Sequence, residues 1–437
     1  AMSRAGMLGI FGAAGLALEA VDEAVRRIQN SLGNKAPYGF NLIHSPQDGA
    51  LESAVVDLYL RRGVRLVEAS AFLDLTLPVV RYRVAGIHRD DRGRVVAPNR
   101  IIAKASRFEV ARKFLSPAPE RHLRALVEQG AITPEQAAMA ATIPMAEDLT
   151  AEADSGGHTD NQPLVVLLPT MIALRDRIAA EHRYDRPLRI GAAGGISTPW
   201  AAAGATAMGA SYLVTGSVNQ SCVEAGTSDA VRAMLAKAQQ ADVAMAPAAD
   251  MFEMGVKVQV LKRGTMFAMR AAKLYEYYRA HDGLDQIPDA DRQSLEKTIL
   301  REPLATVWDQ TRAFFERRDP AQIVRAEADP KHKMALVFRW YLGRSSNWAN
   351  AGEPSRTVDY QIWCGPAMAA FNDWVRGSFL EQAENRRVAT ISLNILYGAA
   401  VLARARFAAL QGVSLPPGVP RLAPLHREEI ENRNAGL

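Results

Sequence analysis

The sequence has 437 residues, of which 48% are hydrophobic and 23% charged, and its formal net charge is +5. This length and composition fit a globular protein with one large β/α barrel and a second element. The basic residues form no dense runs of the kind that bind nucleic acid, and two cysteines are too few for a disulfide framework. No apolar run approaches the roughly 20 residues that cross a membrane, and no signal peptide is visible. We therefore expect a cytoplasmic protein that binds neither nucleic acid nor membrane.

The first part of the chain alternates short apolar strands with helices. Strands are predicted over residues 7–11, 38–43, 64–68, 100–104, 148–153, 188–193 and 211–215. Helices are predicted over 18–28, 51–62, 107–114, 120–128 and 134–141. Residues 77–84 and 94–96 are predicted to be the two strands of an inserted hairpin. This alternation indicates an α/β fold with a parallel sheet, and we expect a TIM (β/α)8-type barrel. The seven strands are one short of closure, so we expect the first βα unit to be absent from this sequence or supplied elsewhere.

The alternation stops near residue 243, and a helical pattern with several prolines follows. Helical segments are predicted over 256–259, 266–279, 292–300, 304–317 and 333–341. We predict a barrel over 1–243 and a helical substrate or lid subdomain over 244–371. The remaining 372–437 is predicted to hold a helix at 387–410, which returns to the barrel, and a loose tail from residue 416.

Three glycine-containing turns follow the last three predicted strands. They are Ser155-Gly156-Gly157-His158, Gly194-Gly195 and Gly216-Ser217. Glycine lets backbone N–H groups approach a ligand closely, and a helix that starts behind such a turn favours phosphate. Because β/α barrels bind phosphate after their last two strands, this order predicts a flavin-binding barrel.

At these turns the chain resembles the PfaD family, the trans-acting enoyl reductases of polyketide and polyunsaturated fatty acid synthases. The resemblance covers nearly the whole chain, including EADSGGHTDNQPL (152–164), IGAAGGISTP (190–199), LVTGSVNQSCVEAGTS (213–228) and DYQIWCGPAM (359–368). It implies an FMN-dependent enoyl reductase that uses NADPH or NADH and acts on thioesters carried by an acyl carrier protein. We also consider a homodimer.

The resemblance also implies roles for individual residues. His158 faces the flavin N5 side, where it orients the thioester or donates a proton to Cα. Lys104 lies beside flavin N1 and O2, where its charge supports the reduced ring. The other flavin contacts implied are Asn41, Glu152, Ser155, Gly156, Gly157, Gly194, Gly195, Gly216 and Ser217. Met251 and Phe252 are predicted to form a lid, and no metal is expected.

Other interpretations stay open at this point. His158 and Asn41 could be structural, Lys104 could be a surface lysine that extends its ammonium to water, and Met251 with Phe252 could be plain core. A nitronate monooxygenase would share the barrel, the FMN and His158, but it would use oxygen and no NADPH. A non-catalytic docking domain of a megasynthase is the alternative from a different functional class.

Overall fold

The computed structural model describes residues 1–33, 35–44, 49–416 and 422–435. The chain divides into two compact units. The barrel unit comprises Ala1–Asp154, Asp160–Gly216 and Val388–Leu437, and the helical unit comprises Ser155–Thr159 and Ser217–Arg387. The predicted segment 244–371 therefore lies inside a helical unit that begins earlier, at Ser217, and extends to Arg387. The predicted barrel, 1–243, contributes residues to both units.

The barrel unit contains a curled, parallel half-barrel sheet, which confirms the predicted α/β class. Its strand order is β1-β2-β3-β6-β7-β9. The strands are β1 (Gly9–Phe11), β2 (Tyr38–Ile43), β3 (Leu66–Ser70), β6 (Arg100–Ala105), β7 (Asp148–Glu152) and β9 (Arg189–Ala193). Each neighbouring pair is parallel, so the carboxyl ends of all six strands lie at the same edge.

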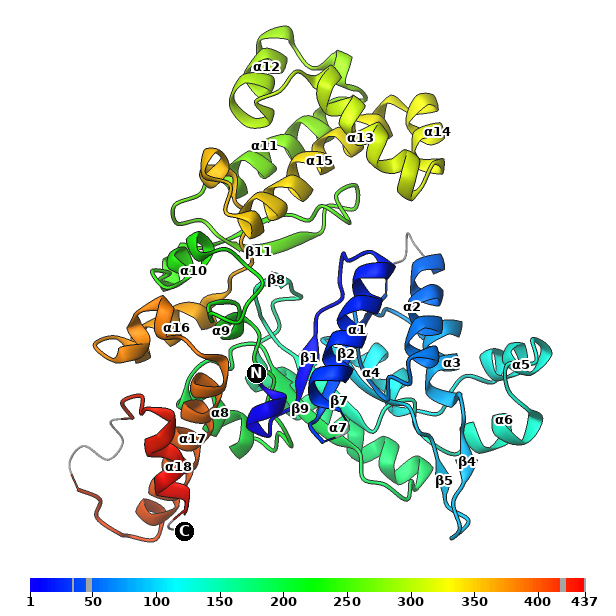
Figure 1. Cartoon of the computed structure of the whole chain (residues 1–437), viewed down its shortest axis with the longest axis vertical. Coiled ribbons are helices and arrows are strands. Elements are labelled where there is room, and N and C mark those ends of the chain that lie inside the picture. The colour runs from blue at the N-terminus through cyan, green and yellow to red at the C-terminus, as the bar shows by residue number, and fades with distance from the viewer. Residues whose placement is uncertain (34, 45–48, 417–421, 436–437) are drawn as a thin grey trace. The chain divides into compact units, whose positions relative to one another are not determined.

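The two faces of this sheet differ in chemistry because side chains alternate along a strand. One face carries Phe40, Val67, Ala103, Leu149 and Ile190, which are fully buried. Helices on this unit cover the sheet, among them α2 (Gly49–Arg61), α4 (Phe108–Leu115) and α7 (Leu164–His182), each in contact with its strands (Figure 1). The opposite face carries polar side chains, which form the candidate site described below.

The predicted seventh strand is present only in part. Residues 211–214 run beside β9, where Ser211 N donates to Ile190 O at 2.7 Å and Val214 N donates to Ala192 O at 2.9 Å. Only an isolated parallel bridge between Ala192 and Leu213 results. The prediction of a full strand over 211–215 was therefore wrong in extent, although the chain takes the expected position beside β9.

The inserted hairpin was also predicted incorrectly in one arm. Residues 77–84 form helix α3 (Leu77–Val84), because Thr76 caps the helix through its hydroxyl and a proline occupies the first turn. The hairpin pairs β4 (His88–Arg89) with β5 (Val95–Val96). The other predicted helices of this region are present as α1 (Leu18–Leu32), α5 (Glu120–Glu128) and α6 (Pro134–Ala140).

The C-terminal part of the chain returns to the barrel unit. Helix α17 (Val388–Leu410) packs against α8 (Pro199–Ala207). By length and composition α17 could cross a membrane, contrary to our expectation for the sequence, but half of its most apolar window is buried in the protein. This burial is typical of a core helix. The predicted loose tail contains helix α18 (Arg427–Ala435), and its residues 417–421 and 436–437 lie outside the described part of the chain.

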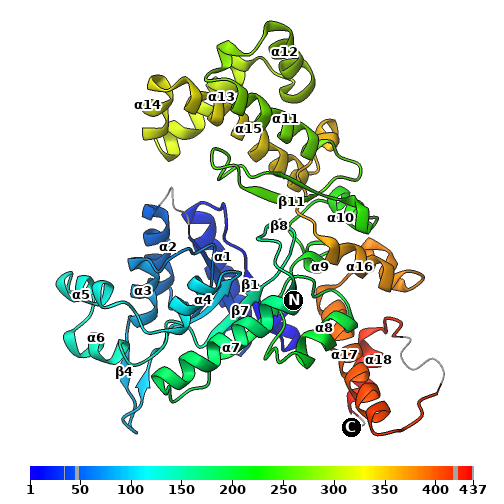
Figure 2. The same cartoon turned by 180° about the vertical axis from the view of Figure 1, so that it is seen from behind.

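The helical unit combines a small antiparallel sheet with a helical core. The sheet order is β10-β11-β8, formed by Val243–Pro247, Lys257–Leu261 and Gly157–His158. The helix predicted over 256–259 is thus a strand, which pairs with β10 along its whole length, and its residues 258–261 are buried. Helix α11 (Phe267–Ala280) packs beside α15 (Pro330–Ala351), as the reverse view also shows (Figure 2).

The other α-helices of this unit and one π-helical turn surround this core. They are α9 (Ser217–Gln220), α10 (Asp229–Leu235), α12 (Asp289–Ser294), the π-helical turn (Leu295–Leu300), α13 (Leu304–Arg318), α14 (Ala321–Ala328) and α16 (Pro366–Val375). Asp359 is fully buried beside α11 and α15, where the Tyr341 hydroxyl of α15 donates to it at 2.8 Å and Arg270 of α11 forms an ion pair with it. A buried carboxylate needs such partners, so this cluster fixes the helical core.

Candidate functional site

Polar side chains gather at the carboxyl ends of the barrel strands. We call Asn41, Glu68, Lys104 and Glu152 the strand-end cluster. Asn41 on β2 lies directly opposite Glu68 on β3, and Lys104 on β6 lies opposite Thr150 on β7. Parallel pairing therefore joins residues that are far apart in the sequence. Asn41, Lys104 and Glu152 are predicted site residues, and Glu68 is one that the sequence interpretation missed.

Lys104 is held by two carboxylates. Its Nζ lies 2.7 Å from Glu152 Oε1 and 3.8 Å from Glu68 Oε1, and its side chain is 20% exposed. Burial alone would lower the pKa of Lys104, but the two carboxylates outweigh it and raise the pKa above its ordinary value. Lys104 therefore stays protonated. An ammonium has three N–H donors, so after the hydrogen bond to Glu152 it can still donate to a ligand.

Glu68 and Asn41 are fixed by the same cluster. Burial raises the pKa of the Glu68 carboxyl, although the charge of Lys104 opposes the shift. Asn41 Nδ2 donates to the Glu68 backbone oxygen at 3.1 Å and to Ser70 Oγ at 2.8 Å. Both amide hydrogens are then used within the protein, which leaves the Asn41 side-chain oxygen as the atom it can offer to a ligand donor.

Tyr212 is a second residue that the sequence interpretation missed. Its hydroxyl lies 3.0 Å from Thr150 Oγ1, and its ring lies against Gly191, where a Cβ would come within 2.2 Å of the ring. Burial raises the pKa of Tyr212, so the phenol keeps its proton. A tyrosine paired with a glycine on the neighbouring strand is not a recognisable sequence signal, which is why the pattern did not reveal it.

The Gly194-Gly195 turn has the backbone expected of a phosphate cradle. Gly194 has φ +84°, and a Cβ there would lie 2.5 Å from the Ala153 backbone oxygen. Gly195 has φ +76°, and nothing lies within 4 Å of its Cβ position. Ser197, two residues on, is 1% exposed, and no described group forms a hydrogen bond with its Oγ. An orphaned buried hydroxyl beside an open glycine turn fits the phosphate end of FMN.

His158 lies in the helical unit, paired with a residue that was not predicted. Its Nε2 is 3.0 Å from Asp250 Oδ1, and its ring contacts the Trp363 ring edge-to-face at 5.9 Å. Partial burial would raise the pKa of Asp250, but the hydrogen bond and charge of His158 hold it below the usual range. Asp250 follows β10, a strand absent from the sequence prediction, so its position after a strand end was not apparent.

Packing accounts for the two glycines before His158. A Cβ on Gly156 would lie 2.8 Å from Cys364 N, and one on Gly157 would lie 2.9 Å from the Trp363 ring. Ser155 O accepts a hydrogen bond from Gln259 Nε2 at 2.7 Å. These contacts hold the turn against β11 and the segment 363–365. A flavin contact for Ser155, Gly156 and Gly157 stays a prediction.

The remaining predicted site residues are Gly216, Ser217, Met251 and Phe252. Gly216 ends a segment of the barrel unit, and Ser217 opens α9 of the helical unit. Phe252 is fully buried among Tyr275, Tyr278 and Phe338, whereas Met251 is half-buried. In this conformation Phe252 is therefore a core residue, and a lid contact would have to come from Met251.

Cysteine and metal chemistry find no support in the described residues. Cys222 and Cys364 are buried free thiols, and burial raises the pKa of each to about 12. Such thiols are not nucleophiles at neutral pH. In the described part of the chain no group of three or more His, Cys, Asp or Glu side chains could hold a metal ion.

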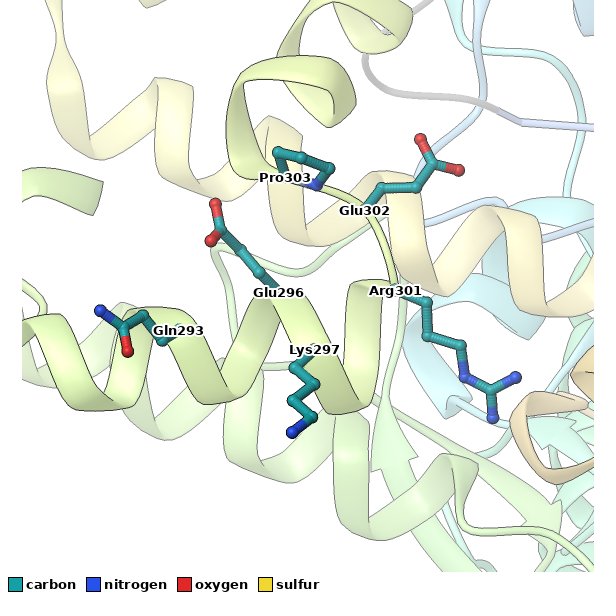
Figure 3. A pocket seen from close by; sticks show the side chains of 6 residues that line it. All are labelled: Gln293, Glu296, Lys297, Arg301, Glu302 and Pro303. Carbon is teal, nitrogen blue, oxygen red and sulfur yellow. The ribbon is translucent and has the colours of Figure 1, made fainter.

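A separate pocket of about 510 Å³ lies in the helical unit (Figure 3). Figure 3 shows Glu296 and Glu302 extending to one side of it and Lys297 and Arg301 to the other. Several of its groups are already committed, because Glu296 accepts from Leu304 N at 2.7 Å and Arg301 donates to Ser355 O at 2.6 Å. The pocket contains none of the predicted site residues, so we do not assign the reaction to it.

Residues 281–360 match the family model described as "[Acyl-carrier-protein] S-malonyltransferase, inserted helical domain". Over 405 residues the chain is 52% identical to a polyunsaturated fatty acid synthase polypeptide of Thraustochytrium sp., covering 91% of this chain and 27% of that protein. It is 46% identical to the polyketide biosynthesis protein PksE of Bacillus subtilis, over 93% of this chain and 52% of that protein. The chain spans between about a fifth and a half of the length of the first curated relatives it matches.

Among solved structures, the chain resembles the enoyl reductase domain of MlnA from the macrolactin biosynthesis cluster of Bacillus amyloliquefaciens. The identity is 39% and the TM-score 0.89, over 94% of this chain and 92% of that domain. A nitroalkane oxidase from Streptomyces ansochromogenes is 14% identical, with a TM-score of 0.52 over 93% of this chain and 92% of the other. At that identity the second likeness shows a shared fold alone.

The raised pKa of Glu68 predicts an unusual effect of neutralising it. A folded-state pKa above the ordinary 4.5 means that ionised Glu68 destabilises the fold, increasingly as the pH rises through and above that value. We expect Glu68→Gln to be more stable than the wild type, with a gain that grows as the pH rises from 4.5 to the raised pKa of Glu68 and stays constant above it. Urea unfolding at several pH values measures this difference.

The matched control is Glu152→Gln, which removes the carboxylate 2.7 Å from Lys104. This variant should lose stability at neutral pH, because Lys104 then keeps its charge without its nearest partner. A Glu68→Gln effect that does not change with pH would contradict the role we assign to burial.

Proposed function

Because the chain belongs to the PfaD-like enoyl reductase family, we propose that it reduces the α,β double bond of enoyl thioesters. In this proposal the substrate is carried on an acyl carrier protein of polyketide or polyunsaturated fatty acid biosynthesis, FMN is the cofactor, and NADPH or NADH is the hydride donor. The strand-end cluster carries the proposal. It sets a protonated lysine, paired with two carboxylates, at the carboxyl ends of parallel strands, where β/α barrels have their active sites.

When bound, FMN would supply the hydride that is added to Cβ of the substrate. The Gly194-Gly195 turn and the Ser197 hydroxyl would hold its phosphate. Lys104 would present a fixed positive charge, and Glu152 and Glu68 restrict where its ammonium can lie. The Asn41 side-chain oxygen would accept a hydrogen bond from the ring system.

The His158–Asp250 pair is the proposed proton-handling group. Asp250 accepts the hydrogen bond from Nε2, which leaves Nδ1 as the ring nitrogen that can exchange a proton with the substrate. In this role His158 would orient the thioester or deliver the proton that Cα needs once Cβ has gained the hydride. Asp250 would position the ring without contacting the substrate.

The two alternatives from the sequence remain distinguishable. A nitronate monooxygenase would need no helical unit for a carried acyl chain, and family membership favours the reductase. A docking domain would have no reason to hold a charged lysine in a partly buried polar cluster, since burying a charge is costly.

A single preparation tests this function. The purified protein should release FMN, with one phosphate, and mass spectrometry should find no FAD. It should consume NADPH when given a crotonyl thioester. Oxygen-dependent turnover of a nitronate without NADPH would identify the monooxygenase instead, and bound flavin without either turnover would identify a docking domain.

Lys104 should matter for electron transfer more than for cofactor binding. We expect Lys104→Ala to slow flavin reduction by NADPH by about 100-fold, the usual effect of losing one preorganised electrostatic contact. The flavin content after purification should change much less. Stopped-flow absorbance measures the rate, and Lys113→Ala, which removes a partly exposed lysine beside Asp74 in the same unit, is the control. Equal rates in the wild type and Lys104→Ala would remove Lys104 from the mechanism.

Basic residues of the helical unit are proposed to meet the carrier protein. The basic residues considered for this role are Lys257, Lys262, Arg263, Arg270 and Lys273. Two of them have other contacts, which makes them weaker candidates. Arg270 is committed to buried Asp359, and Lys273 lies over the Tyr277 ring. Lys257 and Lys262 are exposed at the two ends of β11, and Arg263 is 47% exposed beside Asp242.

Charge reversal of Lys257 and Lys262 together should raise KM for the carrier-bound substrate severalfold. It should leave KM for a small pantetheine thioester unchanged, because only the carrier presents an acidic surface. The effect should shrink as salt is added. Steady-state kinetics with both substrates gives the comparison, and Lys113→Glu is the control. A similar loss for both substrates would show that these lysines do not act in docking.

A further inference from the structure

The small sheet of the helical unit sets Trp363 beside His158 on one face. Val258 on β11 pairs with His158, and Val260, two residues along β11, forms an antiparallel bridge with Trp363. Residues that pair directly across antiparallel strands share a face, and so do residues two apart on one strand. His158 and Trp363 therefore share a face, and their rings contact edge-to-face at 5.9 Å.

The backbone around Trp363 is held tightly on both sides. Leu261 N donates to Ile362 O at 2.8 Å, and Cys364 N donates to Gln259 O at 3.2 Å. Ile362 and Cys364 are 1% and 0% exposed. Together with the short hydrogen-bonded ladder to β11, this burial fixes the direction in which the Trp363 side chain leaves the chain.

Glycines allow the indole to lie directly on the His158 turn. Gly157 has φ +85°, and a Cβ there would lie 2.9 Å from the six-membered part of the ring. Gly365, two residues after Trp363, packs equally closely on the same turn, since its Cβ would lie 2.9 Å from Gly156 N. A side chain at Gly157 would collide with the indole, and one at Gly365 would collide with the backbone of the His158 turn. The arrangement thus preorganises the ring, which lowers the entropic cost of binding a ligand there.

Despite this rigid support, Trp363 is 45% exposed. Trp348, in the core of the same unit, is 8% exposed. An indole gains most when its whole surface is covered, and aromatic side chains of this kind dominate binding energies when a partner covers them. A rigidly held indole that is nearly half exposed and contacts a candidate proton-handling histidine can offer a binding surface to an apolar or planar group.

We propose that Trp363 is a substrate-binding residue, which covers the acyl part of the enoyl thioester beside His158. The inference rests on the proposed function, and it adds the residue that recognises the acyl chain. A conjugated enoyl thioester is planar and its acyl tail is apolar, so both can lie against the indole. Trp363 then holds the double bond near the His158 ring and favours apolar over polar acyl chains.

Binding without turnover tests this role. Butyryl- and octanoyl-pantetheine are saturated, so the enzyme cannot reduce them, and titration calorimetry of the purified protein gives their Kd. We expect Trp363→Ala to weaken octanoyl-pantetheine by about tenfold and butyryl-pantetheine less, while Trp363→Phe loses no more than about threefold. KM for NADPH should stay at the wild-type value in each variant.

The matched control is Trp308→Ala, which removes a half-buried indole on α13 that lies over Lys333 in the same unit. It should bind both thioesters as the wild type does. Thermal unfolding checks each variant, and Trp363→Leu replaces the alanine variant if that one does not fold, with a severalfold loss expected. Wild-type affinity in Trp363→Ala or Trp363→Leu, an equal loss in Trp308→Ala, or a matching rise in KM for NADPH would overturn the proposal.

The same measurements distinguish a wrong role for Trp363 from a wrong proposed function. In that case the wild type itself would neither bind octanoyl-pantetheine nor reduce a crotonyl thioester. A wild type that does both, combined with unchanged binding in the Trp363 variants, would contradict only the role of Trp363.

Discussion

Parallel pairing of six strands is the constraint on which the candidate site depends. Because every strand of the sheet points the same way, polar side chains near the carboxyl ends of β2, β3, β6 and β7 meet at one edge. Lys104 is then partly buried beside Glu68 and Glu152, where its charge is costly unless carboxylates compensate it. The same pairing leaves the opposite face apolar, and helices cover that face. The parallel order of the strands thus places the hydrophobic core of the barrel unit on one face of the sheet and the candidate site on the other.

In the helical unit, His158 belongs to a strand of two residues, so its position depends on the segments that pack around that strand. β8 consists of Gly157 and His158 alone, too short to be stable by itself. Its position comes from β11, from Asp250 after β10 and from the segment 363–365, three parts of the chain that are distant in sequence. The glycines of this turn serve that packing, whatever else they contact.

Much of this could be predicted from sequence, and the failures have specific causes. The strands with continuous apolar runs and the glycine turns were visible because both depend on local patterns. Residues 77–84 were mistaken for a strand because β-branched valines outweighed the capping Thr76, and 256–259 for a helix because four residues cannot establish a period. Asp250, Glu68 and Tyr212 were missed because their roles arise from pairing across long sequence separations. Family resemblance supplied Lys104 and Asn41, and the structure adds the partners that fix them.

The excursion of Ser155–Thr159 into the helical unit limits how this protein can be divided or recombined. The chain passes between the units four times, at residues 154/155, 159/160, 216/217 and 387/388. No single cut releases either unit as one continuous fragment. A chimaera that exchanges only 217–387 would separate His158 from the Asp250 and Trp363 with which it packs. Sequence change in the five-residue excursion is therefore tied to change in the large helical segment, so that recombination between relatives must transfer both pieces or neither.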